Sequence, residues 1–106
     1  MPKYLFEVSY RTDGVKGLLK EGGSGRRSAV EQLLKSAGGK LEAMYYAFGE
    51  TDVYLIAELP DNASAAAISL ATAISGMVRT NVVPLLSPEE IDAAGKKSIK
   101  YRPPGK

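Results

Sequence analysis

The sequence predicts an α+β fold with the element order βαββαβ, followed by a short terminal helix. Two observations carry this prediction. Segments in which apolar residues alternate with other residues are interspersed with segments in which apolar residues recur at helical spacing. In addition, Pro84 lies in the last expected strand, and proline belongs in an edge strand because it lacks a backbone N–H. The split βαβ arrangement places that strand at one edge of an antiparallel sheet.

The first part of the chain should contain one strand and one interrupted helix. Aromatic and β-branched residues alternate with others over residues 3–10, which favours a strand. A helix is expected to begin near Thr12, to break at the glycine-rich residues 21–25 and to resume after Ser24. Its apolar stripe stops at Gly38, where glycine can adopt the left-handed conformation that ends many helices.

A β-hairpin that is apolar on both faces is expected from Leu41 to Leu59. A loop of Gly49, Glu50 and Thr51 would place residues of matching character opposite each other in the two strands. The resulting register pairs Ala47 with Val53, Tyr46 with Tyr54, Met44 with Ile56 and Glu42 with Glu58.

A second helix, a fourth strand and a short third helix complete the order. Asp61 can cap a helix over residues 63–75, in which a stripe of mostly small residues suits close packing on a sheet. This stripe consists of Ala66, Ala67, Leu70, Ala71 and Ile74. A strand is expected over residues 79–86. Pro88 then opens a helix that runs to about Ala94, since proline is favoured in the first helical turn.

The two long helices should cover one face of the sheet and leave the other face open. Side chains expected to face the helices are Val53, Leu55, Ala57, Leu59, Tyr4, Phe6, Val8 and Tyr10. Side chains expected on the open face are Leu5, Glu7, Ser9, Met44, Tyr46, Phe48, Tyr54, Ile56, Glu58, Asn81 and Val83. Because an apolar patch of this extent is typical of an interface, we predict a homodimer joined sheet to sheet.

Composition limits the chemistry that the chain can carry. Its 106 residues allow one domain with a modest core, which gains from oligomerisation. The sequence has neither cysteine nor histidine, which excludes disulfides, thiolate metal sites, a cysteine nucleophile and the usual near-neutral general base. We therefore predict no metal and no cofactor, with Asp, Glu, Tyr, Lys and Arg as the only acid–base groups.

The two ends of the chain differ in character. Met1 leads almost directly into a strand without the features of a signal peptide, so a cytoplasmic location is expected. The net charge of +2 is concentrated at the C-terminus, and we divide the chain into a domain of residues 1–95 and a basic tail of residues 96–106. We expect this tail to be solvated or to clasp another subunit, and we expect it to bind neither nucleic acid nor a membrane.

Two glycine-containing loops are candidates for a ligand site. Asp52 adjoins the hairpin turn, where its carboxylate could meet a ligand; the favoured alternative is an ordinary loop in which Gly49 has positive φ and Asp52 accepts bonds from amides. The glycines before Arg26 and Arg27 could hold a phosphate at a helix start. Their pattern lacks the features of a P-loop, however, and favours a flexible helix break.

Acidic and aromatic side chains on the central strands are the other candidates. If a dimer covers Glu7 and Glu58, each must find a cation, share a proton or face trapped water, and Arg79 could be that cation. Tyrosine rings and hydroxyls could form further walls. The weak candidates for ligand binding are Glu7, Tyr46, Asp52, Tyr54, Glu58 and Arg79, and no catalytic residue is identified.

Several short motifs are spread along the chain: Tyr-Arg-Thr-Asp-Gly over residues 10–14, Gly38-Gly39-Lys40-Leu41, Tyr45, Gly49-Glu50-Thr51-Asp52, Pro60-Asp61 and Arg79-Thr80. Together they resemble the GYD domain family of small bacterial proteins, from Met1 to about Glu90. The chain departs from the family's motif at Thr51, where the family usually has tyrosine before the aspartate. The resemblance implies a ferredoxin-like fold of the dimeric α+β barrel type, and it brings no catalytic residue with it.

Three functions are open on this basis. The favoured one is a homodimeric module that binds a small apolar or aromatic molecule, either between sheet and helices or between two sheets, with Tyr and Glu groups orienting it. The second is a cofactor-independent isomerase or oxygenase in which a buried Glu7 or Asp52 withdraws a proton from an activated aromatic or lactone substrate; this rests on analogy between folds. The third is a purely structural dimer that assembles with other proteins.

Overall fold

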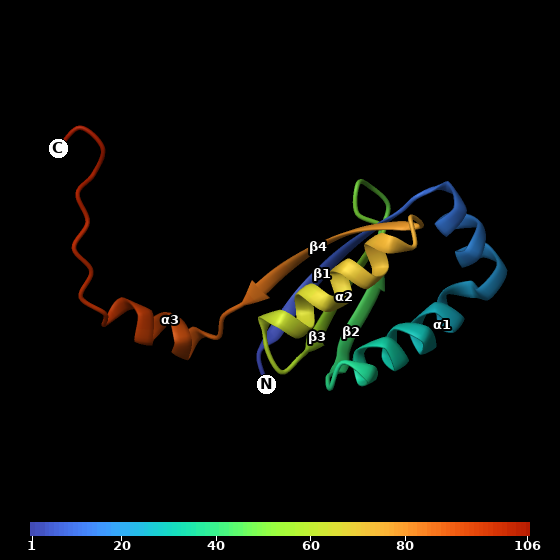
Figure 1. Ribbon diagram of the computed structural model, residues 1–106, viewed down its shortest axis with the longest axis horizontal. Coiled ribbons are helices and arrows are strands. Elements are labelled where there is room, and N and C mark those ends of the chain that lie inside the picture. Colours follow the sequence, from blue (N-terminus) through green and yellow to red (C-terminus); the bar gives the residue numbers. More distant parts are fainter.

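The computed structural model describes residues 1–106 and has the predicted order of elements (Figure 1). Its strands are β1 (Lys3–Tyr10), β2 (Lys40–Tyr46), β3 (Val53–Glu58) and β4 (Val78–Leu85), and its helices are α1 (Thr12–Ser36), α2 (Asn62–Ile74) and α3 (Pro88–Gly95). The strands form one antiparallel sheet in the order β2-β3-β1-β4. This order confirms the ferredoxin-like α+β fold and places Pro84 in an edge strand, as predicted.

Local sequence signals determine where the helices break and end. The backbone of α1 leaves the helical conformation at Gly22, with φ 79° and ψ 163°, so the predicted break is confirmed. At the end of α1, Gly38 has φ 82°, and the N–H groups of Gly38 and Gly39 donate to carbonyls of the last turn. At the start of α2, Asp61 accepts a hydrogen bond from the N–H of Ser64 at 2.8 Å, and this bond lowers the pKa of Asp61 below its usual range.

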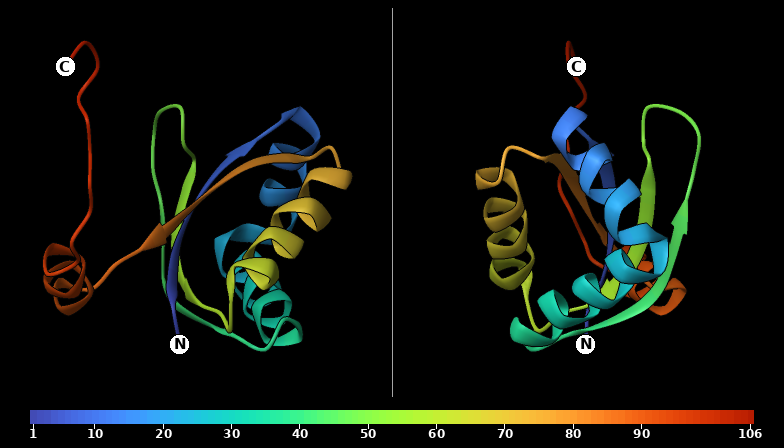
Figure 2. Two further views of the ribbon diagram at one scale, coloured as in Figure 1. Left: turned by 60° about the vertical axis from the view of Figure 1, so that its left-hand side comes forward. Right: turned by 90° about the vertical axis from the view of Figure 1, so that its right-hand side faces the viewer.

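The helices α1 and α2 cover one face of the sheet, and the other face is bare (Figure 2). The core lies between the sheet and these helices, as predicted for the inward residues of β1 and β3. The hydroxyl of the buried Tyr4 donates to Oδ1 of Asn62 at 2.6 Å. The helix α2 packs through Ala65 and Ile68, so the predicted packing stripe that includes Leu70 and Ile74 is wrong, and both of those side chains are exposed. The buried apolar residues are Tyr4, Phe6, Leu34, Val53, Leu55, Ala57, Leu59, Ala65 and Ile68.

The register of the hairpin differs from the prediction by one residue next to the loop, where Tyr46 pairs with Val53, and by two residues at the other end, where Lys40 pairs with Glu58. The loop is longer than expected, because the N–H of Ala47 donates to the carbonyl of Asp52 and encloses the residues between them. The strand β2 also contains a bulge between Leu41 and Ala43. A bulge inserts an extra residue, so Leu41 and Met44 both face the helices although they are three residues apart.

This shift moves side chains of β2 from one face of the sheet to the other. Met44 packs against the core and Tyr46 faces α1, so their predicted place on the open face is wrong. Ala43 and Tyr45 take that place instead. Phe48 lies beyond β2 in the hairpin loop and is fully exposed, so it is not part of the open face either.

The chain after β4 extends away from the sheet and the other helices (Figure 1). Pro88 opens α3 as predicted, and the side chains and amides of Ser87 and Glu90 bond reciprocally in a capping box. This helix buries none of its residues, and the molecule is 55 Å long as a consequence. No helix in the chain has both the length and the apolar character needed to cross a membrane.

Candidate functional site

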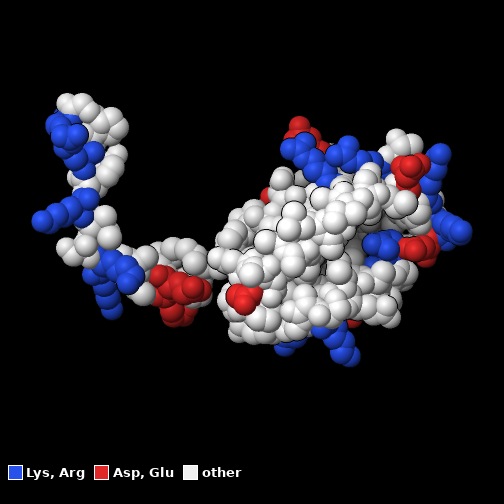
Figure 3. Space-filling model, in the orientation of Figure 1, with Lys and Arg blue, Asp and Glu red and all other residues white.

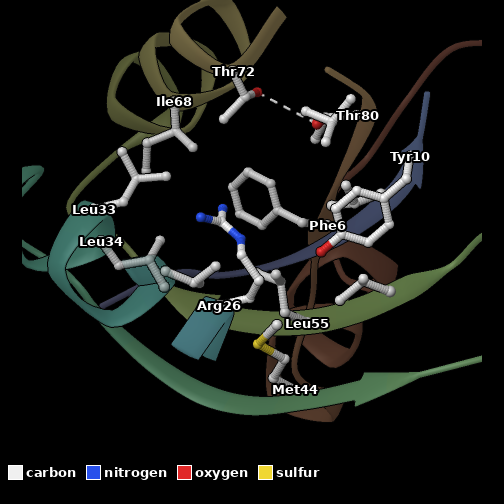
Figure 4. Close-up of a pocket in the computed structure, with 14 residues that line it drawn as sticks. Phe6, Tyr10, Arg26, Leu33, Leu34, Met44, Leu55, Ile68, Thr72 and Thr80 are labelled. Atoms are coloured by element: carbon white, nitrogen blue, oxygen red, sulfur yellow. Dashed lines mark hydrogen bonds between the residues drawn. The ribbon is translucent and has the colours of Figure 1, made fainter. Parts of the chain in front are cut away.

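A cavity of about 70 Å³ lies between the helices and the sheet. It exists because α1 and α2 diverge and make at most sparse contact with each other. Phe6 and Leu55 line it from the sheet, and Leu33 and Ile68 line it from the helices (Figure 4). Eleven of the fourteen lining residues are hydrophobic, so the cavity suits an apolar ligand or part of one.

One charged side chain reaches this apolar space. Arg26 follows the kink in α1, and its side chain points into the ring of lining residues (Figure 4). Its Nη1 donates to Oε2 of Glu21 at 3.2 Å, and the side chain of Arg26 is 34% exposed. A guanidinium has five N–H donors, so Arg26 keeps donors for an anionic group in addition to Glu21.

Hydroxyl groups supply the remaining polarity of the cavity. Thr72 of α2 and Thr80 of β4 lie 3.4 Å apart, measured between their Oγ1 atoms (Figure 4). Thr72 also donates to the carbonyl of Ser69 at 3.0 Å. The hydroxyl of Tyr10 points toward the cavity from the end of β1 (Figure 4). These groups can bind a polar ligand atom without adding charge.

A cleft of about 360 Å³ adjoins the cavity between α1, α2 and β4. The two spaces share five lining residues, which are Tyr10, Arg26, Leu33, Thr72 and Val78. Glu21 lines the cleft, whereas no carboxylate lines the cavity. The arrangement therefore offers an apolar interior and a more polar entrance, with Arg26 at the boundary.

A further cleft, of about 500 Å³, contains two of the predicted candidates, Tyr46 and Asp52. Tyr46 donates from its hydroxyl to the carbonyl of Gly23 at 3.4 Å. Asp52 accepts a hydrogen bond from the N–H of Tyr10 at 2.7 Å. This bond to a backbone amide agrees with the prediction that Asp52 belongs to an ordinary loop and accepts bonds from amides. The other part of that prediction is wrong, because Gly49 does not have positive φ.

The pKa of Tyr46 is raised to about 12. Burial is the main cause, since it disfavours the tyrosinate anion, and the neighbouring Tyr10 hydroxyl adds to the effect. Arg26 acts in the opposite direction without reversing the shift. Tyr46 is therefore a neutral hydrogen-bond donor at physiological pH.

A spectrophotometric titration of tyrosinate should show one of the six tyrosines ionising at about pH 12. Because the folded-state pKa of Tyr46 is raised, its contribution to stability is present below the ordinary tyrosine pKa of about 10 and is lost as the pH rises toward 12. The variant Tyr46→Phe should remove the highest step, and Tyr45→Phe, at a 72% exposed neighbour, should keep it. Loss of that step in Tyr45→Phe alone would contradict the assignment.

The four remaining candidates lie on the open face of the sheet. Glu7 lies opposite Tyr54 in the pairing of β1 with β3. Glu58 forms an ion pair with Lys40, with 3.3 Å between Oε2 and Nζ. Arg79 lies near the start of β4 and forms no ion pair within the chain. None of these four residues lines the cavity.

A family model for the GYD domain matches residues 4–94 of the 106-residue chain. The chain belongs to the GYD domain family. Neither the curated proteins nor the solved structures gave a significant match. All residues that line the cavity of this GYD domain fall within the matched range.

None of the residues that line this cavity of the GYD domain is among the six weak candidates for ligand binding, and Arg26 was considered only beside a glycine-rich loop that the sequence disfavoured as a phosphate site. One signal for them is present in the sequence: Arg26 precedes Val30 and Leu33 by four and seven residues, which places its charge on the apolar face of α1. The cavity itself depends on the divergence of α1 and α2. That divergence is set by tertiary packing, which no local pattern of residues encodes.

Proposed function

We propose that this GYD domain is a homodimeric module that binds a small, mainly apolar organic anion between its helices and its sheet. The observation that carries the proposal is an apolar cavity with a guanidinium group at its boundary. The binding part refines the expectation of an apolar or aromatic ligand, because Arg26 takes the orienting role that was expected for Tyr and Glu side chains.

The size of the cavity sets the shape of the ligand. A dry apolar cavity of about 150 Å³ holds a benzene molecule, so the 70 Å³ found here suits a short hydrocarbon chain rather than a whole aromatic compound. The adjoining cleft of about 360 Å³ has room for a polar head group. A chain in the cavity and a carboxylate at Arg26 would use both spaces at once.

The chemistry of the lining supports binding over catalysis by a general base. Proton abstraction needs a base within hydrogen-bond reach of the substrate. The acids considered for that role, Glu7 and Asp52, do not line the cavity, and Asp52 already bonds the amide of Tyr10. A positive charge in an apolar site suits recognition of an anion.

The open face of the sheet supports the homodimeric part of the proposal. The strand register places four apolar side chains side by side across the sheet, one from each strand. Two copies of the same face can pack in a twofold dimer, because each apolar row then meets its equivalent. The row consists of Ala43, Ile56, Leu5 and Val83.

Binding can be tested with hexanoate and its neutral counterpart, hexan-1-ol, in a titration followed by amide NMR signals. We expect hexanoate to shift the signals of cavity residues such as Phe6 and Ile68. We expect it to bind at least about tenfold more tightly than hexan-1-ol, since a hydrogen bond to a charged group contributes about 1.5–3 kcal/mol. Arg26→Gln should abolish that preference.

Arg27→Gln is the matched control, because it removes the same charge from the exposed neighbouring residue. If neither probe perturbs the cavity signals, the binding proposal fails and the structural-dimer alternative is favoured. If both probes bind equally and Arg26→Gln has no effect, the cavity is a binding site but the preference for an anion is contradicted.

A further inference from the structure

The last 21 residues of the chain, Leu86 to Lys106, lie apart from the domain, and we call them the C-terminal arm. The arm makes at most sparse contact with the sheet or with α1 and α2. It nevertheless contains apolar side chains that are largely exposed to solvent, including Ile91 at 55% and Ile99 at 77%. The exposed apolar residues of the arm are Leu86, Ile91, Ile99 and Tyr101.

The sequence specifies a helix in this arm that is too short to be stable on its own. Pro88 and the capping box favour the first turn of α3. Isolated helices shorter than about 12–15 residues are marginal in water, and α3 has eight residues. The helix therefore needs a surface on which to pack.

The arm lies on the side of the open sheet face, opposite to α1 and α2 (Figure 2). A molecule that covers the open face would consequently lie beside the arm. The sheet of the same subunit is a poor alternative surface for α3. The eight-residue helix α3 is about 12 Å long, whereas an eight-residue strand such as β1 is about 26 Å long. Folding back would leave more than half of the open face uncovered.

From these observations we propose that the C-terminal arm packs on the partner subunit of the homodimer, so that two subunits exchange their arms. The inference rests on the proposed dimer and names a second contact in it. The charges of the arm fit a protein surface, since acidic residues gather on α3 and basic residues on the segment after it (Figure 3). A nucleic acid or a membrane would leave the acidic half without a partner.

The double variant Ile91→Asp/Ile99→Asp in the full chain tests the exchange of arms. Sedimentation equilibrium should show a dimer that dissociates at least about tenfold more readily than the wild type, because two apolar contacts per arm are lost. The matched control is Leu70→Asp/Ile74→Asp, which changes two exposed apolar residues of α2 and should leave the dimer intact. In a dimer of one labelled and one unlabelled subunit, isotope-filtered NOEs should connect Ile91 to the other subunit.

The possible outcomes separate the arm from the dimer itself. A wild-type chain that is monomeric contradicts both proposals. A wild-type dimer that the arm variant leaves unchanged, or whose arm NOEs all lie within one subunit, contradicts the exchange of arms and leaves the sheet-to-sheet dimer standing. Weaker dimerisation together with NOEs between subunits is the result that supports the exchange.

Discussion

Gly39→Ala is expected to lower the free energy of unfolding by about 3 kcal/mol, a value near the upper end for overpacking. A Cβ atom at Gly39 would lie 2.0 Å from the carbonyl oxygen of Glu58 and 2.7 Å from Cδ2 of Leu59. The carbonyl belongs to the backbone at the end of β3, so it cannot move aside as a flexible side chain can. The end of the sheet and the buried Leu59 would both have to shift. Chemical denaturation followed by circular dichroism measures the effect.

Gly49→Ala is the control for this prediction. A Cβ atom at Gly49 meets nothing within 4 Å, and Gly49 does not have positive φ. The substitution should therefore change stability by no more than about 0.5 kcal/mol. If Gly39→Ala were as stable as Gly49→Ala, the close approach of β2 to the end of β3 would be wrong.

Ile56→Lys is expected to weaken the proposed homodimer at least about 100-fold, because like charges brought together at an interface cost several kcal/mol. Ile56 lies in a central strand of the sheet, between Leu5 and Ala43. In a sheet-to-sheet dimer each subunit would bring one lysine into the covered apolar row, where its charge replaces an apolar contact. The dissociation constant can be measured by sedimentation equilibrium.

Ile74→Lys is the matched control, since it makes the same change at a residue of α2 that is 87% exposed. It lies on the helix layer, away from the open face, and should leave the dissociation constant unchanged. Equal weakening by both variants would show a general effect of the added charge. Dissociation by Ile74→Lys alone would place the interface on the helices.

Features encoded by short segments of sequence could be predicted. The break at Gly22, the left-handed end of α1 at Gly38, the cap at Asp61 and the edge position of Pro84 each depend on the conformational limits of one residue. The order of the strands followed from these elements, because a split βαβ chain has few allowed topologies.

Features that depend on pairing between distant segments could not be predicted in the same way. The bulge after Leu41 and the longer hairpin loop shift the register, and a strict period of two cannot show either of them. Met44 and Tyr46 were consequently assigned to the wrong face. The cavity around Arg26 was missed for a related reason, because its apolar lining comes from both helices and the sheet, whereas the sequence placed Arg26 only beside a glycine-rich loop.

In the proposed homodimer a second copy of the chain covers the open face of the sheet. Sedimentation equilibrium of the wild-type chain at micromolar concentration tests it directly. The expected result is a mass of twice the 11.3 kDa chain. A single species with the mass of one chain across the concentration range would contradict it.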